Sequence, residues 1–124
     1  MKIPFVTQIA NLDVKITPAK NTIKDIIGFV DINLEDEKGQ IIFKARGYTI
    51  KVKNFGNSSP VFTVNAPAYK SGYKYKTSFI FENKTQWLEI TRKILSEFNE
   101  LTGDLSPEDF LPKNEEVNPN DIPL

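Results

Sequence analysis

The chain has 124 residues, equal numbers of basic and acidic side chains and a hydrophobic fraction of 40%, which suits one small domain with an appendage. It contains no cysteine and no histidine, which excludes zinc fingers, thiol nucleophiles, serine–histidine triads and disulfide frameworks. The first residues show no signal-peptide pattern, and no apolar run approaches the ~20 residues of a membrane span. We therefore expect a soluble, cytoplasmic protein. The 14 lysines against 2 arginines and the 11 asparagines hint at an AT-rich coding genome, which is compatible with a bacterial cell or a phage-infected host.

Alternating apolar and polar residues predict a sheet of five or six strands, mostly antiparallel because short turns join them. The pattern is clearest before residue 35, where Val30 and Ile32 share one face and Phe29 lies on the other. Gly47 predicts a bend or bulge in a long strand. The expected strands are residues 5–16, 26–34, 41–54, 61–66 and 73–81, with loops at 17–22 and 67–72.

The sequence period changes to that of a helix after residue 82. Asn83 and Gln86 fit a capping box, and apolar residues recur at helical spacing over residues 87–101. Gly103 is a typical helix end. We expect a helix over residues 85–102 that packs on the sheet. The predicted fold class is therefore α+β: a twisted, mostly antiparallel sheet with one C-terminal helix, with an OB-fold-like β-barrel variant as the alternative.

The neutral net charge conceals two regions of opposite sign. Residues 1–99 carry 15 cations and 9 acids, whereas residues 100–124 carry one cation and seven acids. We expect a nucleic-acid-binding domain over residues 1–103 and an acidic, disordered tail over residues 104–124. A helical turn near Ser106 would dock Phe110 on the domain. The basic domain would attract a polyanion.

Residues 38–81 contain eight cations, nine aromatic residues and no acid. Cations for phosphates and rings for bases are the components of a single-stranded nucleic-acid groove, although a sheet with a lysine-rich solvent face gives the same composition. Strand parity predicts that Phe43, Tyr48, Phe79 and Phe81 are buried, and that Phe29 is a further exposed ring. The predicted nucleic-acid-binding residues are Lys44, Arg46, Lys51, Lys53, Phe55, Tyr69, Lys70, Tyr73, Lys74, Tyr75 and Lys76.

Catalytic chemistry finds little support in the sequence. No glycine-rich phosphate loop precedes a helix, and the acids of the domain form no general acid–base pair. Four of the six early acids lie in or beside one exposed hairpin around residues 35–37, which indicates solvation rather than metal binding. We expect neither an enzyme nor a metal or cofactor site.

The last residues, Asp121-Ile122-Pro123-Leu124, resemble the acidic C-terminal tip of bacterial and phage single-stranded-DNA-binding proteins. Those tips typically finish in Asp-(Ile or Leu)-Pro-Phe, so Leu124 replaces the aromatic residue. The resemblance implies that the tip recruits replication and repair proteins. In that family the last side chain enters an apolar pocket, while the terminal carboxylate and nearby acids meet basic residues.

The body is similar in layout to the stage V sporulation protein G (septation regulator) family. The resemblance implies a small α+β nucleic-acid-binding domain, usually dimeric through strand pairing. It covers residues 6–101 and includes a basic loop and a closing helix. The segments that carry it are Asp31-Ile32-Asn33-Leu34, Tyr48-Thr49-Ile50-Lys51-Val52, Phe62-Thr63-Val64-Asn65-Ala66-Pro67 and Ile94-Leu95-Ser96-Glu97-Phe98.

These observations together predict a sequence-independent single-stranded-DNA-binding protein of replication or recombination. Its tip would recruit partner proteins, and the expected assembly is a homo-oligomer, with a dimer favoured. One alternative is a duplex-DNA or RNA-binding regulator of the sporulation-protein type. Another is a protein-interaction module whose lysines only keep it in solution.

Overall fold

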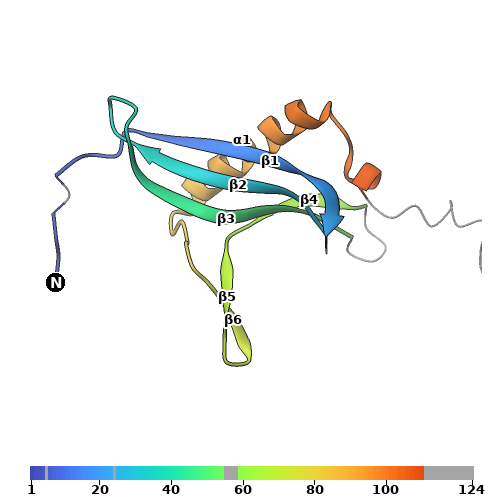
Figure 1. The fold of residues 1–124 in the computed structure, drawn as a ribbon, viewed down its shortest axis with the longest axis horizontal. Helices are drawn as coiled ribbons and strands as arrows, with labels where there is room; N and C mark the ends of the chain where they lie inside the picture. Colours follow the sequence, from blue (N-terminus) through green and yellow to red (C-terminus); the bar gives the residue numbers. More distant parts are fainter. Residues whose placement is uncertain (5, 24, 55–58, 111–124) are drawn as a thin grey trace, which may run out of the picture.

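The computed structural model describes residues 1–4, 6–23, 25–54 and 59–110. Its strands form two open antiparallel sheets, one with the order β1-β2-β3-β4 and one made of β5 and β6 alone. The predicted α+β class is confirmed, and the described strands do not close into a barrel (Figure 1). The elements are β1 (Asn11–Ile23), β2 (Ile26–Glu35), β3 (Ile41–Lys53), β4 (Val61–Asn65), β5 (Ala68–Ser71), β6 (Lys74–Thr77), α1 (Lys84–Thr102) and the 3-10 helix η1 (Pro107–Phe110).

The core lies between α1 and one face of the four-stranded sheet. The buried helix residues are Ile90, Ile94 and Phe98, which follow the spacing of an amphipathic helix. Gly28 on β2 permits this packing, because an added Cβ would come within 3.2 Å of the Phe98 ring and 3.3 Å of Ile50. The sheet supplies the rest of the buried core: Val14, Ile27, Val30, Ile32, Ala45, Tyr48, Ile50 and Val52.

Both predicted caps of the helix are confirmed. The Asn83 side chain accepts a hydrogen bond from the Gln86 backbone N–H at 2.9 Å, which satisfies a donor of the first turn. Gly103 ends the helix in the left-handed conformation, with φ 72°, a backbone position that glycine adopts without steric cost. Two residues, the Asn83 side chain at one end and the Gly103 backbone at the other, therefore define the helix bounds.

Tyr48 on β3 ties the chain after β6 to the core. Its ring is buried, and its hydroxyl donates a hydrogen bond to the Phe79 carbonyl oxygen at 3.1 Å. Burial raises the pKa of the Tyr48 hydroxyl above its ordinary value. Beside it, the rings of Phe81 and Trp87 stack 6.0 Å apart. The chain that returns from β6 to α1 is therefore held by aromatic packing and one buried hydroxyl.

Two segments predicted as loops are strands. Residues 17–22 belong to β1, where Pro18 lies opposite Gly28. An edge strand tolerates proline because one side of its backbone needs no ladder hydrogen bond. Residues 68–71 form β5, so that only Gly72 and Tyr73 remain as the turn to β6. Of the loop predicted at residues 67–72, only Pro67 and Gly72 lie outside a strand.

The start of the predicted tail packs on the domain. The Phe110 ring at the end of η1 lies 5.7 Å from the Phe62 ring and 5.8 Å from the Phe98 ring, so the predicted docking of Phe110 is confirmed. The Asp109 carboxylate accepts a hydrogen bond from the Ser106 backbone N–H at 2.8 Å. The predicted tip, Asp121–Leu124, lies outside the described residues, as does Phe55. No helix in the described part of the chain is long and apolar enough to cross a membrane.

Candidate nucleic-acid interface

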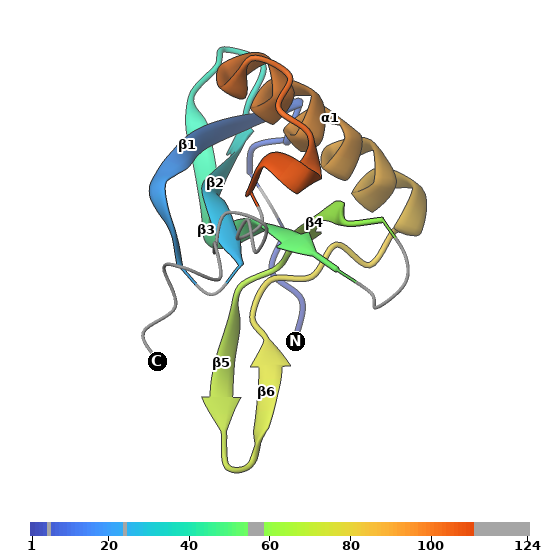
Figure 2. The same ribbon diagram turned by 90° about the vertical axis from the view of Figure 1, so that its right-hand side faces the viewer.

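The β5–β6 hairpin projects away from both the four-stranded sheet and α1 (Figure 2). Its two strands pair only with each other, and a turn at Gly72, with φ 65°, reverses the chain. At its root, the Ser78 backbone N–H donates to the Pro67 carbonyl oxygen at 2.8 Å. A ribbon that contributes no residue to the buried core has no evident structural role in the domain.

Exposed aromatic rings cover the hairpin. Tyr69 is 52% exposed, Tyr75 is 74% exposed and Tyr73 at the turn is fully exposed, so the predicted exposure of these three tyrosines is confirmed. Three exposed rings on one projecting ribbon make it a candidate binding surface. The exposed surface of these side chains is available for contact with a ligand.

The charge of the hairpin is entirely positive. Lys70, Lys74 and Lys76 are exposed, and the hairpin contains no acid. Within the described residues the one ion pair joins Lys93 and Glu97 on α1, at 3.3 Å. No described carboxylate therefore neutralises the hairpin lysines, which leaves a positive potential around the rings.

The strand register places a lysine beside each strand tyrosine. Tyr69 lies directly opposite Lys76, and Lys70 lies directly opposite Tyr75. Because side chains alternate between the faces of a strand, Lys70 and Tyr75 share one face of the hairpin. Tyr69, Lys74 and Lys76 share the other face. A ring and a cation are therefore available together on both faces.

The face that carries Tyr75 borders a hollow of about 440 Å³ against the sheet. Its sheet side is formed by Thr49 and Lys51 of β3 and by Asn65 of β4. We call the face of the four-stranded sheet opposite α1 the open face. Ile50, which lies between Thr49 and Lys51 on β3, packs beside Gly28 and Phe98 on the α1 side. Thr49 and Lys51, together with Asn65, which pairs with Thr49, therefore lie on the open face. Neither Thr49 nor Asn65 was predicted as a site residue, because their position depends on strand register across three elements.

Gly47 allows the hairpin root to approach the sheet closely. Its φ is 95°, and an added Cβ would lie 3.1 Å from the Pro67 Cβ. The β2–β3 register also shifts between the Val30 and Ile32 pairs, so the predicted bulge at Gly47 is confirmed. The bulge brings Pro67, which directly precedes β5, against the open face.

The remaining predicted cations follow β3 along the sheet. Lys44 lies opposite Asn33, at the far end of β3 from Lys53. Lys44, Arg46 and Lys53 are exposed. The structure thus brings Lys51 and Tyr75 together at the hollow, and it places Lys70 opposite Tyr75 on the hairpin. The other β3 cations are spread along the strand. Phe29 is 45% exposed on the open face, as predicted.

Acids of β2 border the basic surface that β3 and the hairpin form. Asp31 and Glu35 of β2 and Asp13 of β1 alternate with the core residues and therefore lie on the open face. Lys15 of β1 lies opposite Asp31 on the same face, so the open face is acidic over β2, of mixed charge over β1 and basic over β3. A polyanion would be attracted to the side of the molecule that bears the hairpin.

Two of the four aromatic residues predicted as buried are exposed. Phe43 is 46% exposed and Phe79 is 38% exposed; their rings meet edge to face, 5.8 Å apart. The prediction failed because β6 ends at Thr77, so Phe79 lies outside any sheet and shields Phe43 only in part. Tyr48 is buried and Phe81 is partly buried, as expected.

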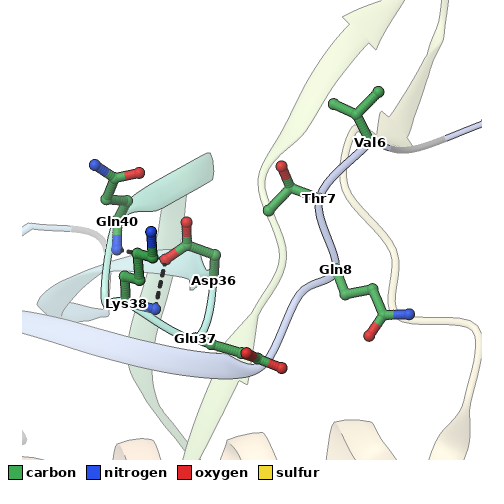
Figure 3. A pocket seen from close by; sticks show the side chains of 7 residues that line it. All are labelled: Val6, Thr7, Gln8, Asp36, Glu37, Lys38 and Gln40. Atoms are coloured by element: carbon green, nitrogen blue, oxygen red, sulfur yellow. Dashed lines mark hydrogen bonds between the residues drawn. The ribbon is translucent and has the colours of Figure 1, made fainter.

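A second hollow, of about 460 Å³, lies between the N-terminal segment and the β2–β3 turn (Figure 3). It carries the acids Asp36 and Glu37, which disfavour a polyanion. The Asp36 carboxylate is occupied by the turn, because it accepts hydrogen bonds from the Lys38 and Gln40 backbone N–H groups at 2.9 Å each. The described residues include no group of three acidic, histidine or cysteine side chains placed to hold a metal ion.

Together the fold and this surface define an α+β domain with a cationic, tyrosine-rich β-hairpin. Comparison of the chain with protein families, with curated proteins and with solved structures finds no match in any of the three. The chemistry of the interface itself therefore has to indicate the function.

Proposed function

We propose that this chain is a sequence-independent single-stranded-DNA-binding protein that acts in replication or recombination. The observation that carries the proposal is the projecting β5–β6 hairpin, on which three exposed tyrosines alternate with three lysines that no described acid neutralises. Such a combination of stacking platforms and cations suits an unpaired strand.

The two residue types would perform separate tasks. Lysines contact phosphates and release condensed counterions, which supplies affinity without reading sequence. Tyrosines stack on bases, and every base offers a ring face, so this contact is also tolerant of sequence. Lys44, Arg46, Lys51 and Lys53 on β3 extend the cationic surface beyond the hairpin.

The partner-recruiting tip is a second part of the proposal. It is supported by the resemblance of Asp121-Ile122-Pro123-Leu124 to the tips of single-stranded-DNA-binding proteins. Phe110 attaches the chain to the domain fourteen residues before its end, which leaves a segment long enough to reach a partner. The expected homodimer likewise stays a prediction.

One observation favours a second candidate function. An antiparallel two-stranded ribbon fits the major groove of duplex DNA, and the β5–β6 hairpin is such a ribbon. In that case Tyr73 and the lysines would enter the groove, and the protein would be a duplex-DNA-binding regulator of the sporulation-protein type. Duplex binding predicts a preference for paired DNA, whereas the first proposal predicts the opposite.

A competition titration separates these functions. The full chain is bound to a fluorescent oligo-dT at low salt and then challenged with unlabelled single-stranded DNA, duplex DNA or RNA of equal length. We expect single-stranded DNA to compete at least tenfold better than duplex DNA. With about four phosphate contacts, log affinity should fall with log salt at a slope of about −3. Better competition by duplex DNA would favour the second candidate, and a salt-independent affinity would remove the electrostatic basis of both.

A further inference from the structure

The hollow beneath the hairpin has the composition of a binding site for a small planar ligand. One wall is the exposed Tyr75 ring, and the opposite side supplies Lys51, Thr49 and Asn65. Ile26 and Ala66 add apolar surface. Its volume of about 440 Å³ falls within the range of small-molecule sites, which combine apolar lining with a few convergent polar groups.

The polar groups of the hollow have unused hydrogen-bonding capacity. The Asn65 amide donates one hydrogen bond, from Nδ2 to the Thr63 hydroxyl at 3.2 Å. A side-chain amide also has a second N–H and an acceptor oxygen, and no other side-chain bond of Asn65 or Thr49 occurs among the described residues. A donor and an acceptor therefore remain available at the sheet side of the hollow.

We propose that this hollow binds one unpaired nucleobase of a DNA strand. The inference rests on the proposed function and specifies which part of the interface distinguishes unpaired from paired bases. The base stacks on Tyr75, its hydrogen-bonding edge meets Asn65 and Thr49, and the adjacent phosphates meet Lys51 and Lys70. Because Lys70 is the cross-strand partner of Tyr75, the ring and this cation reach the same nucleotide.

This arrangement explains how the protein can prefer unpaired DNA without reading sequence. In a duplex, the pairing edge and both faces of a base are occupied by its neighbours. An unpaired base exposes all three, and a side-chain amide can donate to or accept from the edge of any of the four bases. The hollow therefore selects a base that is free, whatever its identity.

The test is a thermodynamic cycle that combines removal of the DNA bases with removal of the Tyr75 ring. The full chain is titrated with oligo-dT and with an oligonucleotide of equal length whose sugars lack bases, so that phosphates are matched and only bases differ. The measured quantity is the ratio of the two affinities. Alanine substitution of a stacking ring costs from about fivefold to more than hundredfold in affinity. We therefore expect Tyr75→Ala to lower the ratio at least fivefold, and Tyr75→Phe to retain it.

Tyr69→Ala is the matched control, because it removes the same ring from the opposite face of the hairpin, away from the hollow. We expect Tyr69→Ala to lower the ratio less than Tyr75→Ala does, and Asn65→Ala to lower it as well. An equal effect of the two tyrosine substitutions, or an unchanged ratio in Tyr75→Ala, overturns the base site while leaving strand binding intact. If the unmodified chain binds neither oligonucleotide, the proposed function itself fails.

Discussion

Excision of the β5–β6 hairpin is expected to abolish binding of oligo-dT and to leave the fold intact. In this variant Asn-Gly replaces residues 68–77. The Pro67 carbonyl oxygen and the Ser78 N–H are already hydrogen-bonded at 2.8 Å, so a two-residue turn can join the two ends. No buried core residue lies in the hairpin. The midpoint of thermal unfolding, followed by circular dichroism, should therefore change by only a few degrees.

The control for this excision keeps the ribbon and changes its side chains. A hairpin of full length, in which serine or threonine replaces the three tyrosines and three lysines, should bind as poorly as the excised variant. Fluorescence anisotropy of labelled oligo-dT measures both affinities. If the excised protein bound oligo-dT as tightly as the unmodified chain, the interface would lie elsewhere on the molecule.

Neutralisation of the three hairpin lysines is the second change with a large expected effect. Lys70, Lys74 and Lys76 are exposed and outside any described ion pair, so alanine substitution should not affect folding. A hydrogen bond to a charged group contributes about 1 kcal/mol or more to the free energy of binding. The three substitutions together should therefore weaken oligo-dT binding by roughly 100-fold at low salt. The slope of log affinity against log salt should become shallower by about 2.

The matched control removes three cations from α1 instead. Alanine substitution of Lys84, Arg92 and Lys93 changes the net charge of the protein by the same amount. These residues belong to the helix, on the side of the sheet opposite the open face. We expect less than a threefold loss of affinity and an unchanged salt slope. Equal losses in both triple variants would mean that net charge, not the hairpin, determines binding.

The elements of the fold were predictable where the signal is local. The caps at Asn83 and Gly103 and the bulge at Gly47 all follow from single residues whose backbone preferences are strong. Pro18 misled the prediction because proline indicates a loop, whereas its actual place on an edge strand depends on which strands lie at the rim of the sheet. Sequence alone does not provide the strand order.

The candidate interface was predictable in composition but not in shape. Alternation of tyrosine and lysine over residues 69–76 identified the chemistry. That these residues form a separate ribbon, and that Tyr75 meets Asn65 and Lys51 at one hollow, follows from long-range register and the close approach of Pro67 to Gly47. Contacts of this kind join residues ten or more positions apart in the chain, and no local pattern encodes them.

The most direct test of the account is to map the bound strand on the full chain by nuclear magnetic resonance. Backbone amide shifts are followed while oligo-dT is added to the isotope-labelled protein. We predict that the shift changes concentrate in residues 68–77 and at Thr49, Lys51 and Asn65, while Ile90, Ile94 and Phe98 in the core stay unchanged. Shifts that stay constant throughout the titration, or that change only along α1, would contradict the assignment of the hairpin as a single-stranded-DNA-binding surface.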